Sequence, residues 1–163
     1  MDRELFELGE QVGAALKSKD LVLTTAESCT GGWIGEVVTM ISGSSAWYDR
    51  GFITYTNAAK QQMLLVKAAT LREHGAVSEA VVREMAAGAL AASSAQIAVS
   101  VSGVAGPTGG TPDKPVGTVC IGWARKGGAV RAETCHFDGD RESVRRQSVV
   151  RALRGVLDLA TGG

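Results

Sequence analysis

Histidine is nearly absent from this chain of 163 residues, which contains only His74 and His136. Because the two lie far apart in the sequence, we expect neither a histidine-rich metal site nor a Ser-His catalytic pair, and we predict no metal and no other cofactor. The three cysteines, Cys29, Cys120 and Cys135, are an odd number without paired spacing. That pattern is typical of a reducing compartment and predicts a cytoplasmic protein.

The chain also lacks net charge and long apolar runs. Its 17 basic and 17 acidic residues cancel, which argues against binding to nucleic acid or to an anionic membrane. No apolar run approaches the roughly 20 residues of a membrane span, and the start Met1-Asp2-Arg3-Glu4 is unlike a signal peptide. We therefore predict a single soluble domain over residues 1–163, with partners other than nucleic acid or membrane.

Glycine, in contrast, is abundant, with 21 residues, of which eight gather at positions 31–32, 103–110 and 127–128. Glycines serve tight turns and the close approach of backbone to a ligand, so the first two clusters mark candidate ligand loops. The last cluster separates two strand-like runs, 116–125 and 129–137, and predicts a hairpin.

The remaining patterns alternate between helix and strand. Apolar spacing and N-capping residues predict helices over residues 3–18 and 33–41 and others that begin at Asn57, Ser78 and Asp140. Short β-branched runs predict strands at 21–25, 51–55 and 97–102. Since strands separated by helices pair in parallel, we expect an α/β fold: a three-layer α/β/α sandwich with a mixed, mainly parallel sheet and a C-terminal hairpin.

Three loops follow the predicted strands, at residues 26–32, 56–60 and 103–115. They contain most of the chain's unusual polar and glycine residues. Ligands of α/β sheets bind at the carboxyl ends of the parallel strands, so we expect these loops to form one site.

The first loop, Glu27-Ser28-Cys29-Thr30-Gly31-Gly32, joins a strand to a helix. A nucleophile on such a turn is exposed, and the first N–H groups of the helix could stabilise an oxyanion or hold a phosphate. Ser28 or Cys29 could attack a carbonyl carbon, although an ordinary helix cap would explain the same residues. The G-x-S-x-G elbow of α/β-hydrolases is missing.

The second loop contains Tyr55, Asn57 and Lys60. A lysine in the first turn of a helix is usually a solvated charge. It can act as a general base when burial or positive neighbours lower its pKa from about 10.4 toward about 7–8. With histidine nearly absent, Ser28 and Lys60 are the available hydrolytic pair, and the Tyr55 hydroxyl could orient either of them.

The third loop, Ser102-Gly103-Val104-Ala105-Gly106, permits a concave row of backbone N–H donors that binds anions, or it is simply a flexible turn. It matches neither a Walker loop nor a dinucleotide-binding turn. Farther along, Thr118 could place a hydroxyl near the same ligand.

Two arginines, Arg141 and Arg145, lie one turn apart at the start of the last predicted helix and share a face. Arginine forks suit phosphate recognition, whereas a solvated helix face is the simpler explanation.

These motifs together resemble a known family. They are Thr25 to Gly32, Gly43-Ser44-Ser45, Tyr55-Thr56-Asn57 with Lys60, Gly75 to Ser78, Ser102 to Pro107, and Lys114 to Thr118. In this order they are similar to the C-terminal domain of competence/damage-inducible CinA proteins, and the resemblance covers nearly the whole chain. The N-terminal pyrophosphatase-like domain of full-length CinA proteins is absent from this sequence, so its activity is not expected here.

The resemblance implies that the chain hydrolyses nicotinamide mononucleotide to nicotinate mononucleotide and ammonia, as a homodimer or higher homo-oligomer. It implies a catalytic pair of Ser28 and Lys60, with Tyr55 nearby. Contacts to the nucleotide substrate are expected from Glu27, Cys29, Thr30, Gly31, Ser45, Asn57, Ser102, Gly103, Val104, Ala105, Gly106, Thr118, Arg141 and Arg145.

Two alternatives stay open at the level of sequence. A non-catalytic module that binds a pyridine nucleotide would use the same glycine loop and arginines. Cys29 could replace Ser28 as the nucleophile.

Overall fold

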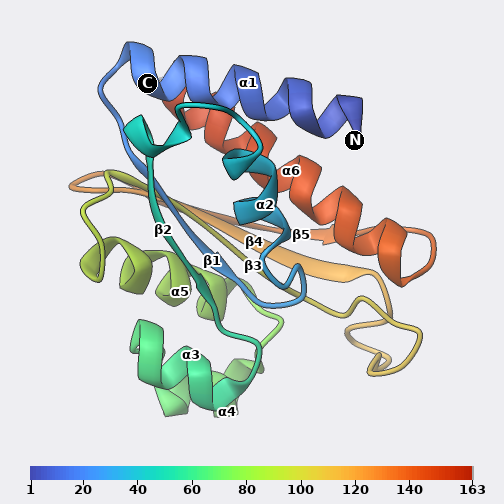
Figure 1. The fold of residues 1–163 in the computed structure, drawn as a ribbon. Helices are drawn as coiled ribbons and strands as arrows, with labels where there is room; N and C mark the ends of the chain where they lie inside the picture. The colour runs from blue at the N-terminus through green and yellow to red at the C-terminus, as the bar shows by residue number, and fades with distance from the viewer. Residues whose placement is uncertain (163) are drawn as a thin grey trace.

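A five-stranded mixed sheet forms the middle layer of the protein in the computed structural model, which describes residues 1–162 (Figure 1). The strands are β1 (Leu23–Glu27), β2 (Tyr48–Ile53), β3 (Ile97–Gly103), β4 (Thr118–Arg125) and β5 (Val130–His136), in the spatial order β2-β1-β3-β4-β5. Strands β2, β1 and β3 pair in parallel, and β4 runs antiparallel to both β3 and β5. Four strands therefore share one direction, and the expected mixed sheet with a C-terminal hairpin is confirmed.

Helices cover both faces of the sheet (Figure 1). One face carries α2 (Trp33–Thr39) and α6 (Arg141–Thr161), with α1 (Arg3–Ser18) lying across them. The other face carries α3 (Asn57–Leu64), α4 (Ala68–His74) and α5 (Glu79–Ala91). This is the expected three-layer α/β/α sandwich. Among residues 1–162, no helix combines the length and the apolar character needed to cross a bilayer.

Trp123 on β4 anchors α6 to the sheet. Its indole is almost fully buried, and its Nε1–H donates to the carbonyl of Ala152 at 3.0 Å. The guanidinium groups of Arg131 and Arg151 each lie 5.1 Å from a Trp123 ring centroid. A hydrogen bond and cation–π contacts of this kind fix the orientation of the buried ring.

The structure corrects several expected boundaries. Strand β2 begins at Tyr48 rather than at residue 51, because it lies at the edge of the sheet and much of it is exposed, so no apolar run marks its start. The cap of α3 is Thr56, not Asn57: its hydroxyl oxygen accepts from the N–H of Ala59 at 3.1 Å. Helix α4 was not expected, since it is short and buries only Leu71.

Replacing Gly155 with alanine is expected to lower the free energy of unfolding by about 1–2 kcal/mol. Gly155 lies on α6, and an added Cβ would overlap the fixed indole of Trp123. Overpacking typically costs about 1–3 kcal/mol, and the close overlap with the indole places this change in the upper part of that range, above the roughly 1 kcal/mol that alanine gains over glycine in a helix. Urea unfolding measures the change, and the neighbouring exposed Arg154→Ala serves as the control. An equal or higher stability of Gly155→Ala would contradict the expected packing.

Candidate active site

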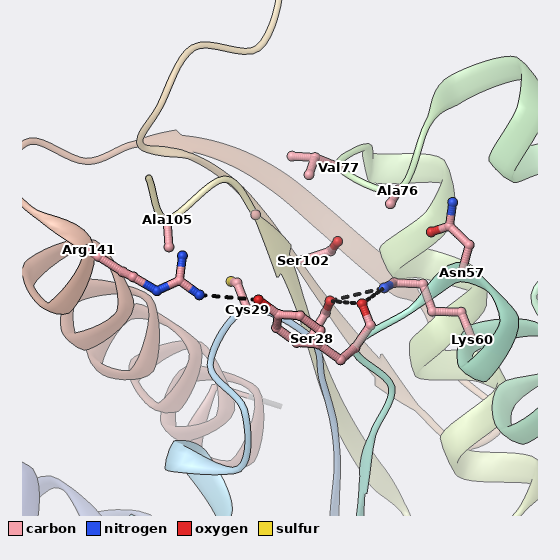
Figure 2. A pocket seen from close by; sticks show the side chains of 11 residues that line it. Ser28, Cys29, Asn57, Lys60, Ala76, Val77, Ser102, Ala105 and Arg141 are labelled. Atoms are coloured by element: carbon pink, nitrogen blue, oxygen red, sulfur yellow. Dashed lines mark hydrogen bonds between the residues drawn. The ribbon is translucent and has the colours of Figure 1, made fainter. Parts of the chain in front are cut away.

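The three loops identified in the sequence meet in one cleft of about 240 Å³ at the carboxyl edge of the parallel strands (Figure 2). The side chains and backbone that line it come from Ser28, Cys29, Tyr55, Asn57, Lys60, Ala76, Val77, Ser102, Gly103, Ala105 and Arg141. Parallel strands bring loops that are distant in sequence to a single edge, which explains why these residues converge.

Lys60 points into the cleft toward Ser28 (Figure 2). Its side chain is 1% exposed, and its Nζ lies 3.0 Å from Ser28 Oγ, 2.9 Å from the Thr54 carbonyl oxygen and 3.4 Å from that of Tyr55. Within residues 1–162 it forms no ion pair with an acidic side chain. Burial lowers the pKa of the Lys60 amine from its usual 10.5, because removal from water disfavours the charged form.

Backbone hydrogen bonds fix the two loops against each other. The Ser28 N–H donates to the carbonyl of Val101 at 3.0 Å and so extends the pairing of β1 with β3 by one residue. The Thr54 N–H donates to the carbonyl of Glu27 at 2.7 Å. The nucleophile candidate and the segment that contacts Lys60 are therefore both part of the edge of the sheet.

The N-terminus of α2 differs from the expected anion site. Glu27 is 2% exposed, and its carboxylate accepts the N–H groups of Gly32 at 3.2 Å, Ile34 at 3.0 Å and Gly35 at 3.0 Å. The Thr30 hydroxyl donates to the same carboxylate at 2.6 Å. A protein side chain thus occupies the helix N–H donors that the sequence offered to an oxyanion or phosphate.

Arg141 and Arg145, the two candidate arginines of α6, make different contacts. Arg141 lines the cleft, donating from Nη1 to the Gly106 carbonyl at 2.9 Å and from Nη2 to the Tyr55 hydroxyl at 3.2 Å. Arg145 instead donates to the carbonyls of Cys29 and Thr30, at 3.0 Å each. Of the two, only Arg141 is therefore placed to meet a ligand in the cleft.

Tyr55 contacts the Ser-Lys pair through its backbone and not through its ring. Its side chain is 60% exposed, and its hydroxyl accepts from Arg141. Its carbonyl oxygen lies 3.5 Å from Ser28 Oγ and 3.4 Å from Lys60 Nζ. The expected orientation of the pair by the Tyr55 hydroxyl is replaced by orientation through the main chain.

Cys29 is buried beside the cleft, at 6% exposure. Burial raises the pKa of its thiol to about 12, because the thiolate would lose its hydration. Since the thiolate is the reactive form, the environment disfavours Cys29 as the nucleophile.

The remaining expected residues fall into two groups. Ser102 lines the cleft at 2% exposure, and its hydroxyl has no hydrogen-bond partner within the described chain, so it is available to a ligand. The residues that do not line the cleft are Glu27, Thr30, Gly31, Ser45, Val104, Gly106, Thr118 and Arg145.

Ser45 and Thr118 illustrate why some expected residues do not line the cleft. Ser45 lies in the 3₁₀ turn η1 (Ser44–Ala46), before β2 begins, and thus at the opposite edge of the sheet from the cleft. The Thr118 hydroxyl donates to the Pro115 carbonyl at 2.7 Å and so fixes its own loop. Ala76 and Val77, in contrast, line the cleft although they were not expected there; the Gly75-to-Ser78 motif was their only signal.

This fold and cleft define a class of protein: three-layer α/β domains with a serine hydroxyl and a buried amine side by side in a cleft at the carboxyl edge of the sheet. A family model described as "CinA C-terminal domain" matches residues 5–160. The chain belongs to that family.

Known proteins similar to the chain include a relative from Escherichia coli named nicotinamide-nucleotide amidohydrolase PncC. It is 56% identical over 154 residues, which cover 94% of this chain and 93% of that protein. A relative of the same name from Pseudomonas putida is 52% identical, covering 94% of this chain and 96% of that protein. The crystal structure of the competence/damage inducible protein CihA from Agrobacterium tumefaciens matches with a TM-score of 0.92 and 43% identity, covering 95% and 94% of the two chains.

The burial of Cys29 predicts a slow reaction with thiol reagents. In the native protein at pH 8, we expect iodoacetamide to modify Cys29 at least about tenfold more slowly than in urea, because the thiol is both inaccessible and protonated. Peptide mass spectrometry measures the modification at each position. Fast native alkylation of Cys29 with loss of activity would restore the thiol as the nucleophile.

The lowered pKa of Lys60 predicts a pH-dependent stability. Between that lowered pKa and the usual 10.5, the unfolded chain binds a proton that the folded chain does not, so the free energy of unfolding rises with pH. We expect the native protein to gain stability relative to Lys60→Met as the pH rises from 7 to 10, measured by urea unfolding. The exposed Lys126→Met is the control and should follow the native protein. Parallel curves for native and Lys60→Met would mean that Lys60 titrates normally.

Proposed function

We propose that this chain is a nicotinamide-nucleotide amidohydrolase that converts nicotinamide mononucleotide and water to nicotinate mononucleotide and ammonia. The observation that carries the proposal is the 3.0 Å contact between the buried Lys60 amine and Ser28 Oγ inside the cleft. The names of the relatives from Escherichia coli and Pseudomonas putida support the substrate class.

The contacts of Lys60 suit a neutral general base. A neutral amine has two N–H groups and one lone pair. When the amine is neutral, the carbonyls of Thr54 and Tyr55 can accept its two N–H groups, and the lone pair is then left for the hydroxyl proton of Ser28, whose Oγ lies 3.0 Å from Nζ. Lysine serves as a base at neutral pH only when its pKa is lowered, and burial lowers it here.

The reaction then proceeds by acyl transfer. Lys60 takes the proton of Ser28 as Oγ forms a bond to the carboxamide carbon, and the carbonyl π electrons move to its oxygen. As the C–N bond breaks, the Lys60 ammonium returns its proton to the leaving nitrogen, which departs as ammonia. Water attacks the resulting ester with Lys60 again as base, and Ser28 Oγ recovers its proton when the acid is released.

One backbone donor is suited to the oxyanion. The Cys29 N–H directly follows the nucleophile and has no hydrogen-bond acceptor among the described residues. An N–H next to the nucleophile is a common oxyanion donor in acyl transfer. We assign it this role because Glu27 occupies the helix donors farther along the chain.

The charge of the cleft suits a phosphorylated substrate. Arg141 is the only arginine that lines it, and no acidic side chain of residues 1–162 does. We assign the phosphate to Arg141 and the carboxamide to the free hydroxyl of Ser102. The electron-poor pyridinium ring activates its own carboxamide, so the protein has less activation to supply than for an ordinary amide, while the phosphate supplies binding energy for positioning.

The burial of Lys60 favours an enzyme over a binding module. Burying an amine without an acidic partner destabilises its charged form, which reduces stability near neutral pH. A module that only bound a nucleotide would gain nothing from placing that amine against a serine hydroxyl.

The metal-free mechanism, the cytoplasmic location and the homo-oligomer are parts of the same proposal. No three His, Cys, Asp or Glu side chains of residues 1–162 gather into a metal-binding group, so no residue is given that role. Analytical ultracentrifugation measures the oligomeric state.

An ammonia-release assay on nicotinamide, its riboside and its mononucleotide tests the proposal. We expect turnover of the mononucleotide above both others, unchanged by a chelator. Ser28→Ala should lower kcat by about 10³-fold or more because the nucleophile is lost. Arg141→Ala should mainly raise KM, by roughly 10–100-fold, because a charge-assisted hydrogen bond to phosphate is lost.

Cys29→Ala is the matched control at the neighbouring position and should stay within about threefold of the native rate, because it removes only the buried thiol and keeps the backbone N–H assigned to the oxyanion. Full activity of Ser28→Ala would remove Ser28 as the nucleophile. Binding of the mononucleotide without any ammonia release would favour the binding module, and sensitivity to the chelator would overturn the metal-free mechanism.

A further inference from the structure

Two side chains of opposite charge form hydrogen bonds to the turn that contains Ser28. Glu27 accepts hydrogen bonds from the N–H groups on one side of residues 28–35, and Arg145 donates to carbonyls on the other side. We propose that Glu27 and Arg145 are positioning residues that hold Ser28 Oγ at the Lys60 amine. The inference rests on the proposed function, in which Ser28 is the nucleophile.

Both oxygens of the Glu27 carboxylate accept hydrogen bonds from the turn and from the first residues of α2. One carboxylate oxygen accepts from the Thr30 hydroxyl and from the N–H groups of Gly32 and Ile34, and the other accepts from the Gly35 N–H. Four donors and the positive end of α2 surround the buried carboxylate, which has no cationic partner among residues 1–162. The Glu27 carboxylate therefore bonds to the turn and not to Lys60, which forms no ion pair within residues 1–162.

The Arg145 side crosses from α6 to the turn. Nε donates to the Cys29 carbonyl and Nη2 to the Thr30 carbonyl, at 3.0 Å each. The guanidinium lies 5.4 Å from the Trp33 ring centroid, which fixes its plane. A planar fork can hold two adjacent carbonyls at once, and a lysine ammonium in its place could not reproduce that geometry.

The backbone of the turn needs such restraint. Gly31 and Gly32 have φ of +59° and +102°, and the Gly32 position before α2 has no capping side chain of its own. Consecutive glycines in the left-handed region are available to many other conformations, so local sequence does not fix the turn. Misplacing a reacting atom by about 1 Å can reduce a rate by about 10²-fold.

Neither residue is placed to bind substrate or to hold the base. Glu27 and Arg145 do not line the cleft. Lys60 is held separately by the carbonyls of Thr54 and Tyr55. Loss of the hydrogen bonds that Glu27 or Arg145 makes to the turn should therefore slow the attack by Ser28, while substrate affinity and the titration of Lys60 stay unchanged.

Glu27→Gln and Arg145→Lys test the inference. In Glu27→Gln, either orientation of the amide turns its NH₂ toward an N–H or O–H donor of the turn. We expect kcat for the mononucleotide to fall by roughly 10–100-fold for Glu27→Gln and about tenfold for Arg145→Lys, with KM within about threefold and the midpoint of the pH–rate profile unchanged. The matched controls are the exposed Glu36→Gln on α2, the helix whose N-terminus Glu27 contacts, and the exposed Arg154→Lys on α6, and both should retain native kinetics.

A second readout does not depend on the substrate. A fluorophosphonate forms a P–O bond with Ser28 Oγ and releases fluoride as the hydroxyl proton passes to Lys60, and mass spectrometry measures the rate of labelling per folded molecule. We expect the variants to label more slowly by the same factors as kcat. Val12→Ala, which removes buried volume in α1, tests general destabilisation and should label at the native rate while folded.

The outcomes separate the two proposals. Native labelling rates in both variants, or a raised KM with native kcat, would overturn the positioning role and leave the nucleophile in place. If Glu27→Gln does not fold, Arg145→Lys decides the question by the same measurements. Slow labelling of the variants in a protein that releases no ammonia would support positioning and contradict the amidohydrolase. No labelling of native Ser28 would overturn both.

Discussion

The contact between the Lys60 amine and the Ser28 hydroxyl is the interaction on which the site depends. The two atoms lie 3.0 Å apart and the lysine is 1% exposed, and burial without an acidic partner among residues 1–162 lowers the pKa of the amine. Two backbone carbonyls satisfy the N–H groups of that amine. The same burial that lowers the pKa of the amine reduces stability near neutral pH.

The charged side chains around Lys60 bond to other groups and form no ion pair with it among residues 1–162. Glu27 is adjacent to Ser28 in sequence, yet its carboxylate is satisfied by the N-terminus of α2 and the Thr30 hydroxyl. Arg141 is bound at the cleft wall by the Gly106 carbonyl and the Tyr55 hydroxyl. The cleft thus has the Lys60 amine at one end and the Arg141 guanidinium at the other, which is the arrangement that the proposed reaction uses (Figure 2).

The sequence predicted the layers of the fold well, because burial imposes helical or alternating periodicity on the residues that face the core. It failed at β2 and α4, since an exposed edge strand and a short helix that buries only Leu71 leave little periodic signal. At the site, the pairing of Ser28 with Lys60 was anticipated from the scarcity of histidine and from family resemblance. The resemblance also implied Ser45, which the structure places before β2 begins, at the opposite edge of the sheet from the cleft.

The sequence by itself determined the sandwich, the strand-to-loop transitions and the residue types available for chemistry, because these depend on local pattern and composition. Tertiary structure alone decided which polar groups meet. In the folded chain the N–H donors of α2 bond to Glu27, and Arg145 bonds to the backbone of the turn. Arg141 lines the cleft. Such pairings join residues up to 116 positions apart, and the geometry of the sheet, not spacing along the chain, sets their distances.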